Sequence, residues 1–463
     1  MHIFLKYGLS ISIVGLLLTA CDNRLNVQPA QSIEQSVALN TEQDVQGTLV
    51  GAYDGLGTSA AAQNGANLYG GTIQYIGDLL GDNRDVVFGG SFATVDEIWR
   101  KAVTTSNTII RDVWLNSYGT INRTNNVLAV LNRVSEANRG NFEGQARFIR
   151  GALYFELIKL FAKNYNDGSP TTNLGVPLVL TPTNLISDAD NRSRNTVTEV
   201  YAQVLDDLTK AESLLPVAQT GFFAPAVPGA TAGFATKGAA QAMLARVYLQ
   251  QQNYAAARDA ANRVITAGTF TLSPTFAGVF TDASPETIFK IVVTDQDGTN
   301  DMNTFYASAL NQGRGDIRVQ TKFRNLYAAN DLRGQFFNRA NQNTFTSKFN
   351  DQYGDVPVVR LAEMYLVRAE ANLRLNTSVG ATPLADVNII RARAGATALT
   401  AVTLPDILLE RRLELAFEGQ QLADIKRTAG TVGTTAYNAN NLVLPIPQRE
   451  IDTNKQLVQN AGY

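Results

Sequence analysis

The residues most suggestive of catalysis are three glutamates near the C-terminus. Glu410, Glu414 and Glu418 are spaced four residues apart, which places their carboxylates one helical turn apart on one face. A glycosidase needs two carboxyl groups that flank a cleft, one of them a general acid. The adjacent Arg411 and Arg412 would lower the pKa of such an acid when it should be raised. The pattern therefore favours an ion-pair network between helices, and a carboxylate-only glycosidase is the less favoured alternative.

Histidine and cysteine are almost absent, and their positions exclude whole classes of chemistry. The only histidine is His2 and the only cysteine is Cys21. If the first 20 residues are removed as a signal peptide, the mature chain has no histidine. Ser-His-Asp triads, Cys-His pairs, imidazole bases and the usual zinc sites are then excluded. A disulfide within the chain is also impossible, because it needs two cysteines.

One acidic stretch has a loose likeness to a calcium-binding loop. Residues 295–301, DQDGTND, place oxygen ligands at alternating positions around Gly298. The distal glutamate of an EF-hand is missing. A solvated turn is the favoured interpretation. We predict no cofactor, and calcium is left open without being assigned.

Sugar recognition has its own requirements, and several residues meet them. A sugar ring presents an apolar face to aromatic planes and hydroxyl groups to planar polar side chains. Trp114 lies in a strongly periodic helical segment, so we expect it in the core. Trp99 borders the polar loop 81–94. The predicted ligand-binding residues are Tyr69, Asp82, Asn83, Phe88 and Trp99, together with Tyr306, Arg314 and Tyr327 from a later region whose aromatic residues could instead form a small core of their own.

The N-terminus predicts export and lipid attachment. Lys6 precedes an apolar run over residues 9–18, which is typical of a secretory signal and too short for a membrane-spanning helix. It ends in Leu-Thr-Ala-Cys, an order similar to a bacterial lipobox, in which Cys21 would receive the lipid. Several acyl chains on one residue give stable anchoring. Residues 22–38 are polar and aperiodic and predict a tether.

Helical periodicity dominates the rest of the chain. The clearest unit is residues 235–268, which predicts two antiparallel helices with a turn at residues 251–254. Apolar residues recur at i, i+3, i+4 and i+7 in each half. A pair this short cannot bury both stripes without neighbours, so it predicts one unit of a helical-repeat scaffold. Further helices are expected over residues 41–53, 102–134, 145–164, 195–215, 361–375, 384–394 and 407–427, the last broken near Gly419. Thr41 and Asp44 predict a capping box at the start of the first of these, and Thr198 is the expected N-cap of the helix over 195–215.

The irregular segments define the predicted domain organisation. Residues 54–71 and 81–94 are polar and glycine-containing, and are predicted as neighbouring surface loops. Residues 287–293 are predicted to form a strand within a less regular region. We predict a signal peptide at 1–20, a lipidated tether at 21–40, the N-terminal part of the scaffold at 41–273, an inserted loop-rich ligand-binding subdomain at 274–358, and the resumed scaffold with an extended tail at 359–463. The fold class is mainly α, with an inserted mixed subdomain that contains short strands.

Several motifs, taken in order along nearly the whole mature chain, resemble the SusD/RagB family of Bacteroidota surface lipoproteins. They are the lipobox, Trp114 with Tyr118 and Asn125-Asn126, residues 235–240 (ATKGAA), 360–363 (RLAE) with 369–371 (AEA), 391–395 (RARAG), 410–419 (ERRLELAFEG) and 444–447 (LPIP). One departure follows Gly419, where the family usually has a basic residue and aromatic residues before an aspartate. Here Gln420, Gln421, Leu422 and Ala423 precede Asp424, and we expect this to alter local packing.

The resemblance implies more than the periodicity does. It implies tetratricopeptide-like repeats, an outer-membrane location facing the exterior, capture of an oligosaccharide, and association with a TonB-dependent transporter of the SusC type that imports it. A peptide-nutrient receptor of the same architecture and a scaffold that binds only protein remain alternatives. The formal net charge is -2, so phosphate neutralisation does not favour nucleic acid as a partner.

Overall fold

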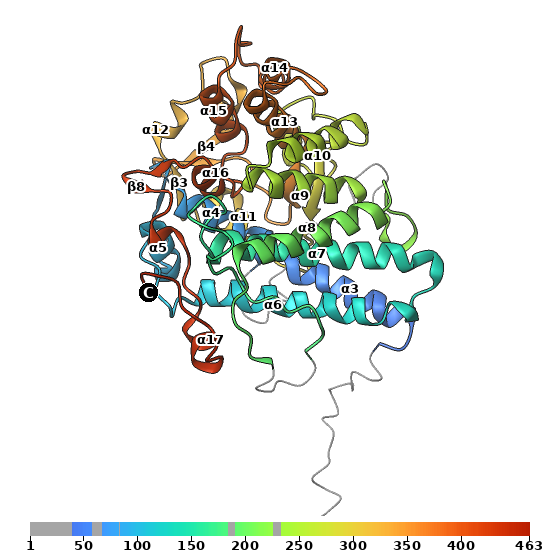
Figure 1. The fold of residues 1–463 in the computed structure, drawn as a ribbon. Helices are drawn as coiled ribbons and strands as arrows, with labels where there is room; N and C mark the ends of the chain where they lie inside the picture. Colours follow the sequence, from blue (N-terminus) through green and yellow to red (C-terminus); the bar gives the residue numbers. More distant parts are fainter. Residues whose placement is uncertain (1–38, 58–66, 83, 184–189, 226–232) are drawn as a thin grey trace, which may run out of the picture.

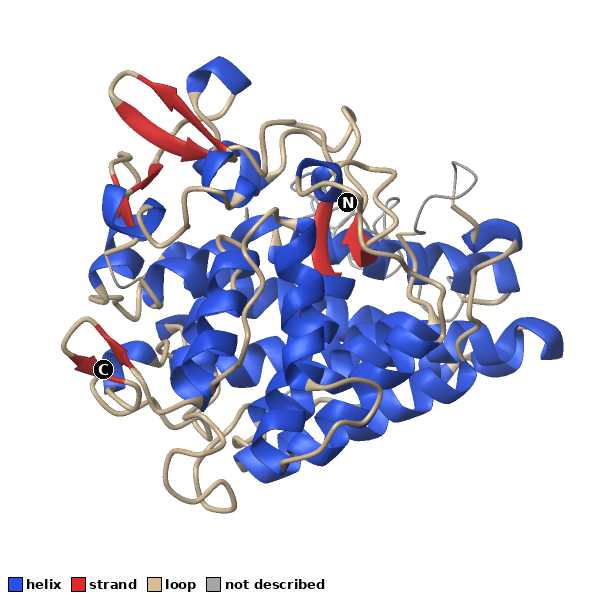
Figure 2. Cartoon of the chain, turned by 90° about the horizontal axis from the view of Figure 1, so that it is seen from above, coloured by secondary structure: helices blue, strands red, loops and turns tan. Residues whose placement is uncertain are grey.

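The computed structural model describes residues 39–57, 67–82, 84–183, 190–225 and 233–463. Cys21, the signal peptide and Asn83 lie outside these ranges. Helices make up most of the body, and the strands are short (Figures 1 and 2). No helix within the described ranges combines the length and the apolar character needed to cross a membrane.

The N-terminal helices form the first layers of the scaffold. They are α3 (Glu42–Gly57), the one-turn π-helix η1 (Leu68–Thr72), α4 (Ile73–Leu80), α5 (Ala93–Arg100), α6 (Thr108–Ala129) and α7 (Glu136–Phe161). Helix α3 packs on α6, and α6 packs on α7. Thr41 caps α3, because its hydroxyl accepts from the amide of Asp44 at 3.2 Å while the Asp44 carboxylate accepts from the Thr41 amide at 2.9 Å. The reciprocal cap predicted from these two residues is confirmed.

The scaffold continues as a row of antiparallel helices. Helix α8 (Val197–Leu214) packs between α7 and α9 (Lys237–Gln250), and α9 packs on α10 (Tyr254–Thr266). The helix pair predicted over residues 235–268 is therefore confirmed. Its contact line is built of small residues, since Ala240, Ala257 and Ala261 are fully buried.

The last scaffold helices begin almost a hundred residues later. Helix α13 (Leu361–Leu375) packs directly on α10, and α14 (Pro383–Arg393) and α15 (Leu404–Glu414) pack on α13. Helices α16 (Gln421–Arg427) and α17 (Gln448–Thr453) follow. The break predicted near Gly419 is confirmed, because residues 415–420 separate α15 from α16.

One strand pair ties the segment between α10 and α13 to the N-terminal part of the chain, and a second pair closes the segment on itself. It contains β2 (Thr287–Ile291), α11 (Asp301–Tyr306), β3 (Ile317–Val319), α12 (Thr321–Arg324), β4 (Phe337–Ala340), β5 (Asn343–Thr346) and β6 (Val356–Arg360). Strand β2 pairs antiparallel with β6, and β3 pairs antiparallel with β1 (Val86–Phe88) from the N-terminal part. Two short hairpins, β4–β5 and β7 (Thr431–Val432) with β8 (Thr435–Ala436), complete the strands of the described residues. The boundaries drawn at 273 and 359 stay a prediction.

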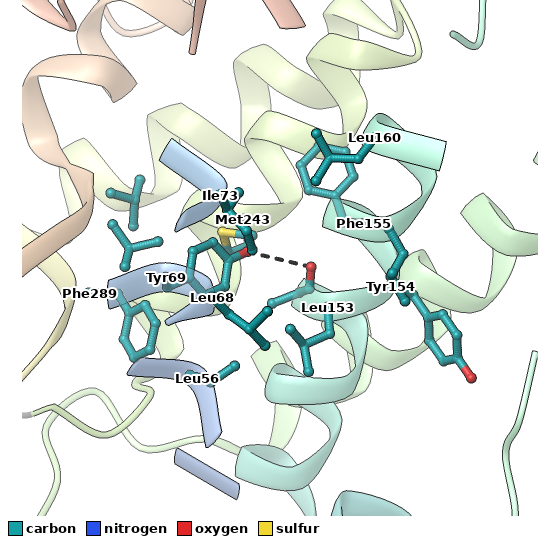
Figure 3. Packing of buried hydrophobic residues seen from close by; sticks show 14 of the residues in the cluster. Leu56, Leu68, Tyr69, Ile73, Leu153, Tyr154, Phe155, Leu160, Met243 and Phe289 are labelled. Atoms are coloured by element: carbon teal, nitrogen blue, oxygen red, sulfur yellow. Dashed lines mark hydrogen bonds between the residues drawn. The ribbon is translucent and has the colours of Figure 1, made fainter. Parts of the chain in front are cut away.

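Buried side chains from distant parts of the chain meet in one large core. Figure 3 shows Leu56 of α3, Leu153 of α7, Met243 of α9 and Phe289 of β2 packed together. A second, smaller cluster lies among α13, α14 and α15. Because Phe289 belongs to the first core, strand β2 contributes to the packing of the scaffold helices.

Two local predictions are wrong for identifiable reasons. Helix α8 is capped by Thr196, not Thr198, because Thr196 forms a reciprocal cap with Glu199, whereas Thr198 lies inside the first turn. Part of the predicted loop 54–71 is helical: α3 runs on to Gly57, and η1 begins at Leu68. Burial of Tyr53, Leu56 and Gly57 extends α3 in spite of its glycines. Residues 58–66 of this loop lie outside the described ranges.

Candidate functional site

Strands β1 and β3 bring together two loops that are more than 200 residues apart in sequence. Val86 pairs with Val319 and Phe88 with Ile317. The amide of Gly89 donates to the carbonyl of Asp316 at 2.7 Å, and the amide of Gln320 donates to that of Asp85 at 2.8 Å. The predicted polar loop 81–94 therefore lies beside the segment that carries Arg314. Figure 1 shows β3 and α5 on the same side of the molecule.

The side chains of Ser91, Phe92, Arg314 and Asp316 form a small cluster at this junction, called the Phe92 surface below. Ser91, Phe92 and Arg314 are exposed, and Asp316 is buried. Phe92 is 44 % exposed, although it is a large apolar residue. The guanidinium carbon of Arg314 lies 4.4 Å from the centroid of its ring. Arg314 also donates to the Asp316 carboxylate at 2.8 Å and to the Ser91 hydroxyl at 3.3 Å. The surface thus presents an aromatic ring beside hydrogen-bonding groups of both polarities.

The backbone below Phe92 fixes this arrangement. Phe92 is the N-cap residue of α5, and its ring packs edge-on against Phe305 of α11 at 6.1 Å. Gly90 precedes it, and a Cβ atom at Gly90 would lie 2.4 Å from the carboxyl carbon of Asp316. Only glycine therefore allows the Asp316 carboxylate to lie against this turn.

Trp99 and Asp82 contact each other at the base of the same loop. The indole Nε1 of Trp99 donates to Asp82 Oδ2 at 3.1 Å. The other Asp82 oxygen accepts from the amides of Asp85 and Val86 at 2.7 and 3.1 Å. Burial raises the pKa of Asp82, and these amide hydrogen bonds oppose the rise. Trp99 is half-buried, so part of its ring faces outward.

Tyr69 and Tyr306 were predicted to belong to a ligand-binding surface, but both side chains are buried. They are 2 % and 0 % exposed. Tyr69 lies in the core of Figure 3 and donates to Glu156 at 3.1 Å. Tyr306 donates to Asp78 at 2.7 Å. Both hydroxyl groups are satisfied by buried carboxylates, which explains why two tyrosines from polar sequence surroundings lie inside.

Phe88 and Tyr327 were also predicted to bind ligand, but both contact other parts of the protein instead. Phe88 is buried because strand β1 turns Val86 and Phe88 inward, which contradicts its predicted surface role. Tyr327 is half-buried and donates to the carbonyl of Leu413 at 3.0 Å. Of the predicted residues described by the structure, Arg314 and Trp99 are those with side chains at the surface of the β1–β3 junction.

Phe92 was missed by the sequence analysis, although it lies inside the predicted loop. The pattern Gly-Gly-Ser-Phe at residues 89–92 carried a signal, because an aromatic residue after a flexible turn has no strand to direct it inward. No local sequence pattern indicated Asp316 as a site residue. Its position depends on the pairing of β1 with β3, which links residues that are far apart in the chain.

The glutamates of residues 410–418 belong to a buried ion-pair network, as predicted. Glu414 contacts Arg333 at 3.2 Å and Arg360 at 3.1 Å, and it also pairs with Arg393. Burial alone would raise the pKa of Glu414, but the surrounding guanidinium groups hold it well below its usual value. The pKa of Glu418 is also lowered against the effect of burial, by Arg360 and Lys348. A general acid needs a raised pKa, so these carboxylates are unsuited to that role.

Residues 295–301 form a hydrogen-bonded turn and a helix start. Asp297 accepts from the amide of Thr294 at 2.8 Å, and Asn300 caps α11. Asp301 accepts from the Thr72 hydroxyl at 2.9 Å. Within the described ranges, no three His, Cys, Asp or Glu side chains are grouped as metal ligands. Trp114 is 3 % exposed, and its prediction as a core residue is confirmed.

Two family models match the chain. The model described as starch-binding associating with outer membrane matches residues 25–249, and the model of the SusD family matches residues 334–442. SusD-like protein P2 of Formosa agariphila is 23 % identical over an alignment of 536 positions, which covers 99 % of this chain and 100 % of that protein. The chain belongs to the SusD/RagB family.

Solved structures agree with this assignment of the fold. A putative sugar binding protein from Bacteroides vulgatus superposes with a TM-score of 0.78 at 25 % identity, covering 92 % of this chain and 99 % of the other. Surface glycan-binding protein A from Bacteroides thetaiotaomicron, in complex with laminarihexaose, superposes with a TM-score of 0.73 at 20 % identity, covering 91 % and 99 %. The mainly α, tetratricopeptide-like fold is that of the SusD superfamily.

Proposed function

We propose that the protein is a non-catalytic, lipid-anchored glycan-binding protein of the outer membrane. The main observation that supports this proposal is the Phe92 surface, where an exposed aromatic ring lies beside the guanidinium of Arg314, which is paired with the carboxylate of Asp316. The ring matches the apolar face of a sugar, and the polar groups match its hydroxyl groups. The family description and the laminarihexaose complex of a structural relative support a glycan as the ligand class.

The anchor and the partner belong to the same proposal. Acylation at Cys21, after removal of residues 1–20, holds the body to the outer membrane through the polar tether, facing the exterior. A TonB-dependent transporter of the SusC type receives the oligosaccharide from this body. Radiolabelled palmitate incorporation tests the anchor, because Cys21→Ser removes the acceptor thiol and abolishes the label. Co-purification of a TonB-dependent transporter with the protein from detergent-solubilised outer membranes tests the partner.

Affinity gels containing different polysaccharides test the binding site. Phe92→Ala is expected to weaken retention of the mature protein by about tenfold, because truncating a central aromatic anchor typically removes at least 1.4 kcal/mol of binding free energy. Trp99→Ala tests the half-buried tryptophan beside the same loop and is expected to have a smaller effect, because its indole nitrogen is already bonded to Asp82.

Phe222→Ala is the matched control. Phe222 is 59 % exposed and lies between α8 and α9, away from the β1–β3 pair, so its removal should leave retention unchanged. Equal retention of wild type and Phe92→Ala would contradict the assignment of the Phe92 surface. Retention of peptides but of no glycan would favour the peptide-receptor alternative, and release of reducing ends from a retained glycan would overturn the non-catalytic role.

A further inference from the structure

A separate pocket of about 170 Å³ lies between helices α4, α15 and α16. Its walls come from Asp78 of α4, from Leu408, Arg411 and Arg412 of α15, and from α16 and the residues that follow it. A protein cavity of roughly 150 Å³ is known to hold a six-membered ring. The pocket therefore has the capacity for one ring-sized ligand. None of the four residues that define the Phe92 surface lines it.

The lining combines an apolar floor with polar groups of both kinds. Leu408, Leu415, Phe417 and Ile425 supply apolar surface. Gln420, Gln421, Thr428 and Thr431 supply amide and hydroxyl groups that both donate and accept. A pocket with a few convergent polar groups on an apolar lining is the usual form of a small-molecule site.

The charges of the pocket are already balanced inside the protein. Arg411 contacts Asp424 at 3.1 and 3.2 Å, and Arg412 contacts both oxygens of Asp85 at 2.5 and 2.6 Å. With both guanidinium groups paired to carboxylates, the pocket offers no uncompensated positive charge to an anionic ligand. Asp78 in its wall is hydrogen-bonded to the Tyr306 hydroxyl and the Gly419 amide. A neutral ligand suits it better than an anion.

Two donors of these arginines are nevertheless unused. Arg411 Nη1 and Arg412 Nε are buried and have no hydrogen-bond partner within the described part of the chain. Both atoms belong to side chains that line the pocket, but each is shielded from solvent by the surrounding protein. The polar groups that an occupant meets are therefore the side-chain amides and hydroxyl groups of the lining.

We propose that this pocket is a second sugar site that takes one neutral hexose ring, free or at the end of a chain. The ring's apolar face lies against the Leu408 and Phe417 side, and its hydroxyl groups meet the amide and hydroxyl groups of Gln420, Gln421, Thr428 and Thr431. Naming sugar as the class rests on the proposed function. The position, size and neutrality of the site rest on the pocket itself. The sequence departure at residues 420–423 borders it, since Gln420 and Gln421 lie in its wall.

Saturation-transfer NMR on the mature protein, with millimolar glucose, galactose, mannose and glucuronate as separate probes, tests this site. Wild type is expected to transfer saturation to at least one neutral hexose and more weakly to glucuronate. In the Phe92→Ala background, which removes the contribution of the Phe92 surface, Thr431→Trp is expected to abolish the signal. Thr431 lines the pocket and is exposed, so a large side chain there fills the pocket without disturbing the core. Leu408→Phe fills the pocket from α15 and should also lower the signal.

Matched controls separate this site from the Phe92 surface. In the Phe92→Ala background, Thr434→Trp, in the turn of the same β7–β8 hairpin but outside the lining, should keep the hexose signal that remains. No hexose signal in that background, a remaining signal that survives both pocket-filling variants, or a preference of the remaining signal for glucuronate would each overturn the inference. If the inference fails in this way but polysaccharide retention still depends on Phe92, the pocket proposal is wrong and the proposed function is unaffected.

Discussion

At the scale of single residues, the most heavily constrained group is the carboxylate of Glu414. It is fully buried and contacts Arg333, Arg360 and Arg393. Arg333 and Arg360 are themselves 1 % exposed. Buried charges are tolerated only when they are paired and hydrogen-bonded, so each member of this network depends on the others. Through Arg360 and Arg393, Glu414 connects α15 to the end of strand β6 and to α14.

Glu414→Gln is expected to lower the free energy of unfolding by about 3 kcal/mol, because breaking a buried ion pair leaves uncompensated guanidinium charge. Urea unfolding monitored by circular dichroism measures this. Asp206→Asn is the control, since Asp206 pairs with Lys210 and both side chains are nearly half exposed. Its effect should stay below about 1 kcal/mol. Equal decreases in the free energy of unfolding for the two variants would show that burial does not determine how much an ion pair contributes to stability.

At the scale of secondary-structure elements, the caps show which polar residue begins a helix. Thr196 accepts from the amide of Glu199 at 3.2 Å, and Glu199 accepts from the amide of Thr196 at 2.8 Å. Two amides that the helix cannot satisfy are thereby paired. Thr198 is two residues further on, and its hydroxyl oxygen is buried without a hydrogen-bond partner in the described structure.

Thr196→Ala is expected to destabilise the protein by about 1 kcal/mol, the usual effect of losing an N-cap hydroxyl. Thr198→Ala should be neutral or slightly stabilising, because it removes a buried hydroxyl that makes no hydrogen bond. The midpoints of urea unfolding of the two variants distinguish these outcomes. A larger loss in Thr198→Ala would return the cap to the residue first predicted.

At the scale of the whole molecule, Asp78 joins three distant parts of the chain. From α4 it accepts from the Tyr306 hydroxyl of α11 at 2.7 Å and from the amide of Gly419, between α15 and α16, at 3.0 Å. Burial raises the pKa of Asp78 to about 7, although both hydrogen bonds oppose the rise. The folded state therefore holds this proton at pH values where the unfolded chain has released it.

This raised pKa has a defined effect on stability. The contribution of Asp78 is fully present below about pH 4 and is lost as the pH rises to about 7, because the folded state binds the proton more tightly. Asp78→Asn removes the titration, so its stability relative to wild type should increase between about pH 5 and pH 8. Urea unfolding at both pH values measures the change.

Asp406→Asn provides the contrast. The hydroxyl and amide of Thr403 lower the pKa of Asp406, so this carboxylate stays ionised across the same range in both states. The stability difference between Asp406→Asn and wild type should therefore be flat from about pH 5 to pH 8. A flat profile for Asp78→Asn as well would contradict the assigned role of its proton.

The sequence by itself determined the helical scaffold and the ion-pair role of residues 410–418, because both follow from residue types and spacing over short stretches of chain. The expected single helical face for the three glutamates holds for Glu410 and Glu414, whereas Glu418 lies beyond the end of α15. Helical periodicity located α9 and α10, and adjacent arginines marked Glu414 as a structural carboxylate. Residues 81–94, predicted as a polar loop, contain strand β1 and the start of helix α5. Within this stretch the sequence analysis chose Phe88 and missed Phe92.

Only the tertiary structure decided which side chains reach the surface together. The pairing of β1 with β3 buries Phe88, exposes Phe92 and places Arg314 over its ring. Tyr69 and Tyr306 moved inside because buried carboxylates accept from their hydroxyl groups. Such contacts join residues more than 80 positions apart, and local patterns in a single sequence carry no information about partners at that distance.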